Sequence, residues 1–168
     1  LDPIKNQPMM LRALKLIRQT HPDTVLLMVG DGPEREKLES LALELGIADK
    51  VIFTGFREDA HRFYKIMDIF LLTSFSEGTA MTLLEAMATR LPCIVTDVGG
   101  NPEIVRHEET GFVIPSDDEN RLAGRIRCLF EDRRLRKTLS DAARKRFEEN
   151  FTVKQMVAAY QKMYDGDA

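Results

Sequence analysis

Two glutamates on either side of a predicted helix start form the part of this sequence best suited to chemistry. Glu77 and Glu85 lie eight residues apart, and Gly78 follows the first of them. The apolar pattern predicts a helix over residues 80–89, so that Glu77 lies in the preceding loop and Glu85 inside the helix. The N-terminus of a helix offers free backbone N–H groups and a partial positive charge of about half a unit. A carboxylate inside that helix can accept hydrogen bonds from hydroxyl groups. Taken alone, both glutamates could also be solvated surface acids.

A second glycine-marked turn follows the next predicted strand. Gly99 and Gly100 come after the apolar run 93–96 and precede a predicted helix start, with Asn101 as its cap and Pro102 in its first turn. Capping does not need two glycines, which also let a ligand approach the backbone closely. Two helix N-termini at one edge of a sheet make an anion site. The combination suits a ligand with both phosphate and hydroxyl groups, such as a nucleotide sugar.

The elements that position these residues alternate between apolar runs and helical patterns. This alternation predicts an α/β domain with a mostly parallel sheet. Strands are expected over residues 25–29, 51–53, 69–72, 93–96 and 112–114. In such sheets ligands bind beyond the carboxyl ends of the strands, where the strand order reverses. Both glycine turns fall at such ends.

Composition excludes several classes of protein. The 168 residues are 43% hydrophobic and 30% charged, which is typical of a globular domain. The net charge of −3 gives no basic footprint for nucleic acid, and no apolar run reaches the roughly 18–20 residues of a membrane span. Cys93 and Cys128 lack metal-ligand spacing and lie in apolar patterns. We therefore expect buried, reduced thiols in a cytoplasmic protein.

Other motifs in the sequence are weaker indications of function. Gly30, Asp31 and Gly32 resemble the opening of a dinucleotide fingerprint, but Arg35 stands where a third small residue is needed. A plain strand-to-helix turn is the favoured interpretation. Asp31 and Asp97 lie at separate strand ends without an acidic pair, which disfavours a magnesium-dependent receiver domain. The three histidines share no spacing and are assigned no catalytic role.

These motifs together resemble the C-terminal, donor-binding half of a GT-B glycosyltransferase of retaining family 4, also described as glycosyl transferases group 1. The similarity runs from Asp2 to Tyr164, and its most specific part is the Glu-x7-Glu element followed by the double-glycine turn. The other matching segments are VLLMVGDGPER (25–35), VIFTGF (51–56), EAMATRLPCIVTDVGGNPEIV (85–105) and TGFVI (110–114). The resemblance implies a Rossmann-like three-layer αβα domain over residues 1–150. It also implies a C-terminal helix over 151–168 that packs on an N-terminal domain.

The resemblance implies a role for each matching residue. Glu85 would bind the ribose hydroxyls of the donor nucleotide, Glu77 would contact the donor sugar, and Lys5 would grip the diphosphate. Glu77 and Lys5 are therefore the catalytic candidates. The remaining donor-binding candidates are Gly78, Thr79 and Ala80 for the diphosphate or sugar, Gly99 and Gly100 at the second turn, and Gly55 and Phe56 near the nucleobase.

Three departures from the family pattern stand out. The family usually carries an arginine five residues before the lysine, and this chain begins at Leu1, one residue too late to include it. Arg90 stands where glycine is common, which we expect to alter a helix end rather than chemistry. Thr79 and Ala80 replace a frequent aromatic-proline pair, which leaves the donor sugar open.

The resemblance also implies a mechanism. Breaking the bond between sugar and phosphate leaves negative charge on the nucleoside diphosphate, which must be stabilised as it develops. Asp117 and Asp118 are interpreted as a helix cap and no other paired aspartates are seen to hold a metal. We therefore expect Lys5 and the helix N-termini to act without a metal or other cofactor. The family implies retention of the anomeric configuration. An acceptor domain on the N-terminal side would be needed for activity, so this chain alone is expected to be inactive.

The first strand of the family's sheet lies centrally, between the second and fourth, and nothing before Leu1 supplies it. We expect either a rearranged sheet, a longer protein, or another chain in the gap. A dimer through that strand position or through the terminal helix is one alternative. Contact with a glycan or with the inner membrane face would run through the N-terminal domain. Rival functions on the same architecture are a non-catalytic nucleotide-binding or interaction module, a nucleotide-sugar epimerase and a sugar phosphorylase.

Overall fold

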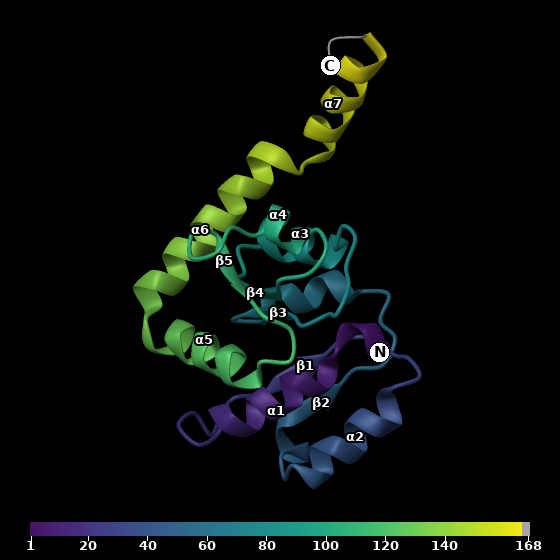
Figure 1. The fold of residues 1–168 in the computed structure, drawn as a ribbon. Helices are drawn as coiled ribbons and strands as arrows, with labels where there is room; N and C mark the ends of the chain where they lie inside the picture. The colour runs from purple at the N-terminus through teal and green to yellow at the C-terminus, as the bar shows by residue number, and fades with distance from the viewer. Residues whose placement is uncertain (166–168) are drawn as a thin grey trace.

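Five short parallel strands form two separate sheets in the computed structural model, which describes residues 1–165 (Figure 1). In the first sheet β1 (Leu26–Met28) pairs with β2 (Val51–Phe53). The second sheet has the order β3-β4-β5, formed by β3 (Phe70–Leu72), β4 (Cys93–Thr96) and β5 (Gly111–Ile114). All five strands lie where the apolar runs predicted them, within one or two residues. The α/β class with a parallel sheet is therefore confirmed.

Helices cover both faces of the three-stranded sheet. The α-helices are α1 (Gln7–Ile17), α2 (Arg35–Glu44), α3 (Met81–Ala88), α4 (Asn101–Ile104), α5 (Glu119–Glu131), α6 (Arg133–Asn150) and α7 (Val153–Asp165), with 3-10 helices η1 (Pro3–Lys5), η2 (Ala48–Lys50) and η3 (Ala60–Lys65). Alternate residues of β4 point to opposite faces. Cys93 and Val95 pack with α3 and α4, and Ile94 packs with α1 and α5. The result is the three-layer αβα arrangement.

The expected break in the sheet is present. β1 and β3 both line one groove with a volume of about 970 Å³, and neither pairs with the other. Helices α1 and α5 also line this groove, through residues that include Leu14 and Ile126. Within residues 1–165 no strand lies between β1 and β3. The described residues therefore form two sheets that are not joined to each other.

Helix α7 projects from the end of α6, away from both sheets (Figure 1). Its large apolar side chains are exposed: Val153, Met156, Val157, Tyr160, Met163 and Tyr164. The part of the predicted 151–168 helix that covers residues 166–168 lies outside the described residues. None of the helices in residues 1–165 combines the length and apolar character needed to cross a bilayer.

The two cysteines differ in burial. Cys93 is fully buried in β4, and burial raises the pKa of its thiol. Cys128 in α5 is half-buried, so the prediction of two buried thiols is correct for Cys93 only. Neither forms a disulfide.

Arg90, directly after the end of α3, has a left-handed backbone with φ +62°. Glycine adopts this conformation at helix ends without the steric cost of a Cβ atom. The side chain pairs with Asp141 of α6 at 3.0 Å. The departure from glycine therefore affects a helix end, as the sequence predicted.

Candidate functional site

An ion pair joins the N-terminal segment to the loop after β3. The Nζ atom of Lys5 lies 2.7 Å from Oε1 of Glu77, and Ser74 Oγ donates a hydrogen bond to the same oxygen at 2.5 Å. The Glu77 side chain is 8% exposed, whereas that of Lys5 is 42% exposed. The carboxylate is therefore fixed in place, and the ammonium group still reaches solvent. Sequence reasoning assigned Lys5 and Glu77 separately and missed Ser74.

The backbone around Lys5 is anchored to the end of β3. The hydroxyl of Thr73 lies 3.0 Å from the carbonyl oxygens of both Lys5 and Asn6. Asn6 has φ +47°, and its Nδ2 donates to Asp117 Oδ1 at 2.9 Å. Asparagine tolerates this left-handed conformation better than most residues. These contacts hold Lys5 at the carboxyl edge of the three-stranded sheet.

The two glycine turns pack against each other. The N–H of Gly100 donates to the carbonyl oxygen of Glu77 at 3.3 Å. A Cβ atom on Gly99 would overlap that same carbonyl oxygen, and one on Gly100 would lie 2.6 Å from the carbonyl oxygen of Gly78. Gly99 also has φ +49°. The sequence interpretation explained the two glycines by the close approach of a ligand. In the structure they allow the backbone of one turn to pack against the backbone of the other. The tandem glycines thus lie on the same rim as Glu77.

Several backbone donors in these turns are free. Among residues 1–165 no acceptor takes the N–H of Gly78, Thr79, Ala80 or Gly99. The first three lead directly into α3, whose N-cap residue is Ala80. The first of these free amides follows Glu77, the residue that pairs with Lys5, so this rim is suited to an anion. The second helix adds little dipole, because α4 has four residues.

Asn101 does not cap α4 as the sequence predicted. Gly100 is the N-cap residue, and Asn101 is fully buried. Its Nδ2 donates to the carbonyl oxygen of Thr96 at 3.1 Å, and its Oδ1 has no partner within residues 1–165. The same carbonyl oxygen accepts from the N–H of Val98 at 2.9 Å, so Asn101 adds a second hydrogen bond to the last residue of β4. Asn101 therefore fixes the turn to the strand rather than satisfying the helix start.

Glu85 is exposed on α3 and does not point into the core. Its Oε2 accepts a hydrogen bond from the hydroxyl of Tyr64 at 2.9 Å. Tyr64 belongs to η3 and is buried among the residues under α3. Sequence reasoning missed this residue. The signal was a tyrosine in the amphipathic segment before β3, because a buried tyrosine hydroxyl needs a partner.

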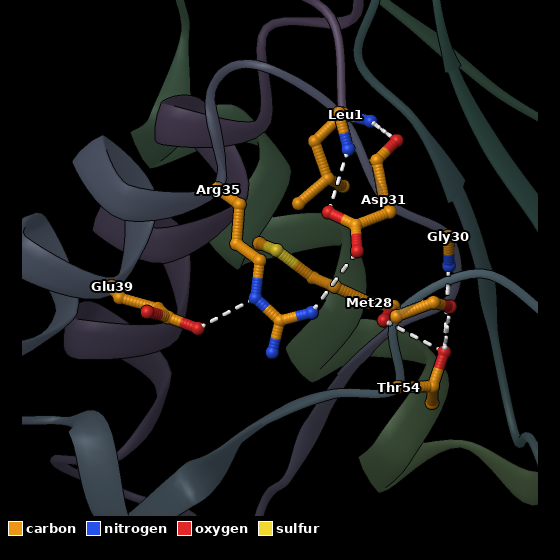
Figure 2. Close-up of polar contacts among 9 residues, drawn as sticks. Leu1, Met28, Gly30, Asp31, Arg35, Glu39 and Thr54 are labelled. Atoms are coloured by element: carbon orange, nitrogen blue, oxygen red, sulfur yellow. Dashed lines mark hydrogen bonds and ion pairs between the residues drawn. The ribbon is translucent and has the colours of Figure 1, made fainter.

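The turn after β1 is structural. Gly30 donates its N–H to the carbonyl oxygen of Gly55 at 3.1 Å, which joins the ends of β1 and β2. Asp31 pairs with Arg35 at 3.5 Å, and Arg35 pairs in turn with Glu39 at 2.8 Å (Figure 2). The favoured interpretation of this segment as a plain strand-to-helix turn agrees with these contacts.

Gly55 and Phe56 lie on the other half of the fold, at the end of β2. Gly55 has φ +69°, and Phe56 is 77% exposed. The chain continues from Phe56 into η3, which carries Tyr64 to Glu85. The short segment from Phe56 to Tyr64 therefore leads from the end of β2 to the Glu85 carboxylate. The groove lined by β1 and β3 lies between the two sheets.

One rim of the fold brings together Lys5, Glu77, Gly78, Gly99 and Gly100. Helix α3 connects this rim to Glu85. Within residues 1–165 no group of three or more His, Cys, Asp or Glu side chains is arranged to hold a metal ion. Chemically, the rim offers one ammonium group, free amides and two carboxylates with different exposure.

A protein-family model for glycosyl transferases group 1 matches residues 1–146. N-acetyl-alpha-D-glucosaminyl L-malate synthase of Bacillus anthracis is 36% identical over 145 residues, which cover 86% of this chain and 38% of that protein. This chain therefore spans less than half the length of that relative.

Solved structures of other glycosyltransferases share the fold, and two examples follow. Anabaena HepE in complex with UDP superposes with a TM-score of 0.92 at 26% identity, covering 99% of this chain and 46% of that one. HepE has also been solved with UDP-glucose. The C-terminal domain of a glycosyl transferase group 1 family protein, LpcC of Francisella tularensis, gives a TM-score of 0.82 at 24% identity over 91% of this chain and 83% of that one. The architecture is the Rossmann-like half of a GT-B glycosyltransferase.

Proposed function

Because this chain belongs to the glycosyl transferases group 1 family, we propose that it is the donor-binding half of a retaining, family 4 glycosyltransferase. The enzyme transfers a hexosyl group from a nucleoside-diphosphate sugar to an acceptor. Residues 1–150 bind the donor, and the helix over 151–168 packs on an N-terminal acceptor domain. The enzyme acts in the cytoplasm, and this half alone is inactive.

The observation that carries the proposal is the Lys5–Glu77 pair beside the free amides of the two glycine turns. The Lys5 Nζ atom is 2.7 Å from Glu77 and retains exposure to solvent. A diphosphate can therefore draw the ammonium group toward itself without disturbing the backbone that holds it. Glu77 keeps its hydrogen bond from Ser74 when Lys5 moves. The complexes of HepE with UDP and UDP-glucose support this class of ligand.

Charge development gives each group its role. As the bond between the anomeric carbon and the phosphate breaks, the diphosphate oxygens gain negative charge. Lys5 and the free N–H groups of Gly78, Thr79 and Ala80 stabilise that charge, since preorganised donors act without solvent reorganisation. Glu77 is positioned for the donor sugar, and Glu85 for the ribose hydroxyls. We expect this chemistry to need no metal or other cofactor.

Replacing Glu85 with alanine tests the donor site. We expect nucleoside diphosphate to bind the full-length protein about 10–100-fold more weakly, because hydrogen bonds to a charged group contribute about 1.5–3 kcal/mol. Isothermal titration with UDP, GDP and ADP measures the change and identifies the base. Glu44, an exposed glutamate at the end of α2, provides the matched control. Glu44→Ala should bind as the wild type does.

Two results would contradict the proposal. One is a full-length protein that binds none of the three diphosphates, as expected of an interaction module. The other is unchanged affinity in Glu85→Ala.

A further inference from the structure

The carboxylate of Glu85 accepts one hydrogen bond within residues 1–165. Within residues 1–165 its only hydrogen bond or ion pair is the one from Tyr64, at 2.9 Å between the hydroxyl and Oε2. A glutamate on an exposed helix face otherwise samples several rotamers, and fixing it costs conformational entropy. Here the contact with Tyr64 selects one of those rotamers before any ligand arrives.

Tyr64 itself is rigid. The residue is 8% exposed, and its ring packs against Phe70 with 6.0 Å between ring centroids. It belongs to the same buried cluster as Leu72 and Leu83, so the sheet and α3 both hold it. The hydroxyl also lies 3.3 Å from the carbonyl oxygen of Thr82, a second acceptor on the same helix. The oxygen atom is therefore fixed relative to α3.

The Tyr64 hydroxyl stays protonated. Burial raises its pKa, and the hydrogen bond to Glu85 raises the pKa further. Tyr64 therefore acts as a neutral donor at any pH at which the protein works, and Glu85 acts as the acceptor.

From this geometry we propose that Tyr64 is a positioning residue that makes the donor site select ribonucleotides over 2′-deoxyribonucleotides. The inference rests on the proposed function, in which Glu85 receives the ribose hydroxyls. With Oε2 held by Tyr64, Oε1 accepts no hydrogen bond within residues 1–165 and is available to a ligand. A ribose diol then binds a carboxylate that has already lost its rotational freedom. A deoxyribose lacks the 2′-hydroxyl and gains less from the same preorganisation.

Tyr64→Phe separates this role from a structural one. The substitution keeps the buried ring and removes only the hydroxyl. We expect the full-length protein to bind the ribonucleoside diphosphate up to about tenfold more weakly, because binding must then also immobilise the Glu85 side chain. Binding of the matching 2′-deoxyribonucleoside diphosphate should weaken by a smaller factor, because its sugar offers the carboxylate the 3′-hydroxyl alone. Titration calorimetry measures both dissociation constants. The dissociation constant of the deoxyribonucleotide divided by that of the ribonucleotide should therefore fall.

Further variants complete the experiment. Glu85→Asp leaves the tyrosine untouched but withdraws the carboxylate by one methylene, so it should lower the same ratio. In a double-mutant cycle, Tyr64→Phe should add nothing to Glu85→Ala. Ser40→Ala removes an exposed hydroxyl on α2 and should leave both affinities unchanged.

Three outcomes would overturn the inference. Equal weakening of both nucleotides by Tyr64→Phe would indicate a general structural role. An unchanged ratio in Tyr64→Phe, with a lowered ratio in Glu85→Ala, would leave the proposed function standing and remove Tyr64 from it. Absence of nucleotide binding by the wild type would instead remove the proposed function, and this inference with it.

Discussion

Replacing Lys5 with methionine is expected to lower the turnover number for sugar transfer by about 10²–10³-fold, the effect typical of losing one preorganised donor to a developing oxyanion. Methionine retains an unbranched apolar stem but carries no charge for the departing diphosphate. The fold should survive, because the backbone of Lys5 is held by Thr73 and Glu77 keeps its bond from Ser74. Loss of the charge should therefore appear in catalysis far more than in stability.

Steady-state kinetics of the full-length enzyme with its acceptor measures the Lys5 effect. Lys145 on α6 is a suitable control, because it is exposed and its one ion pair within residues 1–165 is a 3.8 Å contact with Glu149. Lys145→Met should retain the wild-type turnover number. A turnover number for Lys5→Met within about fivefold of wild type, where one donor is worth about 10²–10³, would show that the ammonium group does not stabilise the leaving group.

Gly99→Ala is expected to lower the free energy of unfolding by about 2–5 kcal/mol and to abolish nucleotide binding. A left-handed backbone costs a residue with a Cβ atom about 1–2 kcal/mol. Relieving an overpacked contact costs about 1–3 kcal/mol more. The new Cβ atom would meet the carbonyl oxygen of Glu77, a backbone atom that cannot rotate away. The two turns must then separate, which displaces the free amides.

Two other glycines calibrate this result. Gly124 lies inside α5, and a Cβ atom there would have no neighbour within 4 Å. Gly124→Ala should raise the free energy of unfolding by about 0.5–1 kcal/mol, through better helix propensity. Gly78→Ala also meets no protein atom within 4 Å, so stability should hold while nucleotide binding weakens. Chemical denaturation and titration calorimetry measure both quantities. Wild-type stability in Gly99→Ala would contradict the packing of the two turns.

Local patterns were sufficient to predict the secondary structure. Continuous apolar runs marked all five strands, because a parallel strand covered on both faces has no polar side. Cys93 to Thr96 shows the reason, since all four residues are buried. The family resemblance, rather than periodicity, predicted the break between β1 and β3. A helix-start pattern predicted α4 correctly but gave its capping residue wrongly.

Contacts between distant segments could not be predicted from spacing. Asn101 turns inward because the end of β4 lies beneath it, a fact of tertiary structure. The glycine pair meets the Glu77 backbone for the same reason, although any ligand would also benefit from the small residues. The hydrogen bond from Tyr64 to Glu85 spans 21 residues and two elements. Sequence reasoning identified the groups with chemical potential and missed those that orient them, Ser74 and Tyr64.

Backbone amide shifts of glycine test most directly whether a nucleoside diphosphate binds between Lys5 and the two turns. This chain contains ten glycines, so selective ¹⁵N-glycine labelling of the full-length protein gives few signals from it. Titration with the tightest-binding nucleoside diphosphate should shift Gly78, Gly99 and Gly100, and the shifts should saturate at the calorimetric dissociation constant. Gly46 after α2 and Gly124 in α5 should not move. Unchanged signals from the first three glycines at saturating nucleotide would contradict the site.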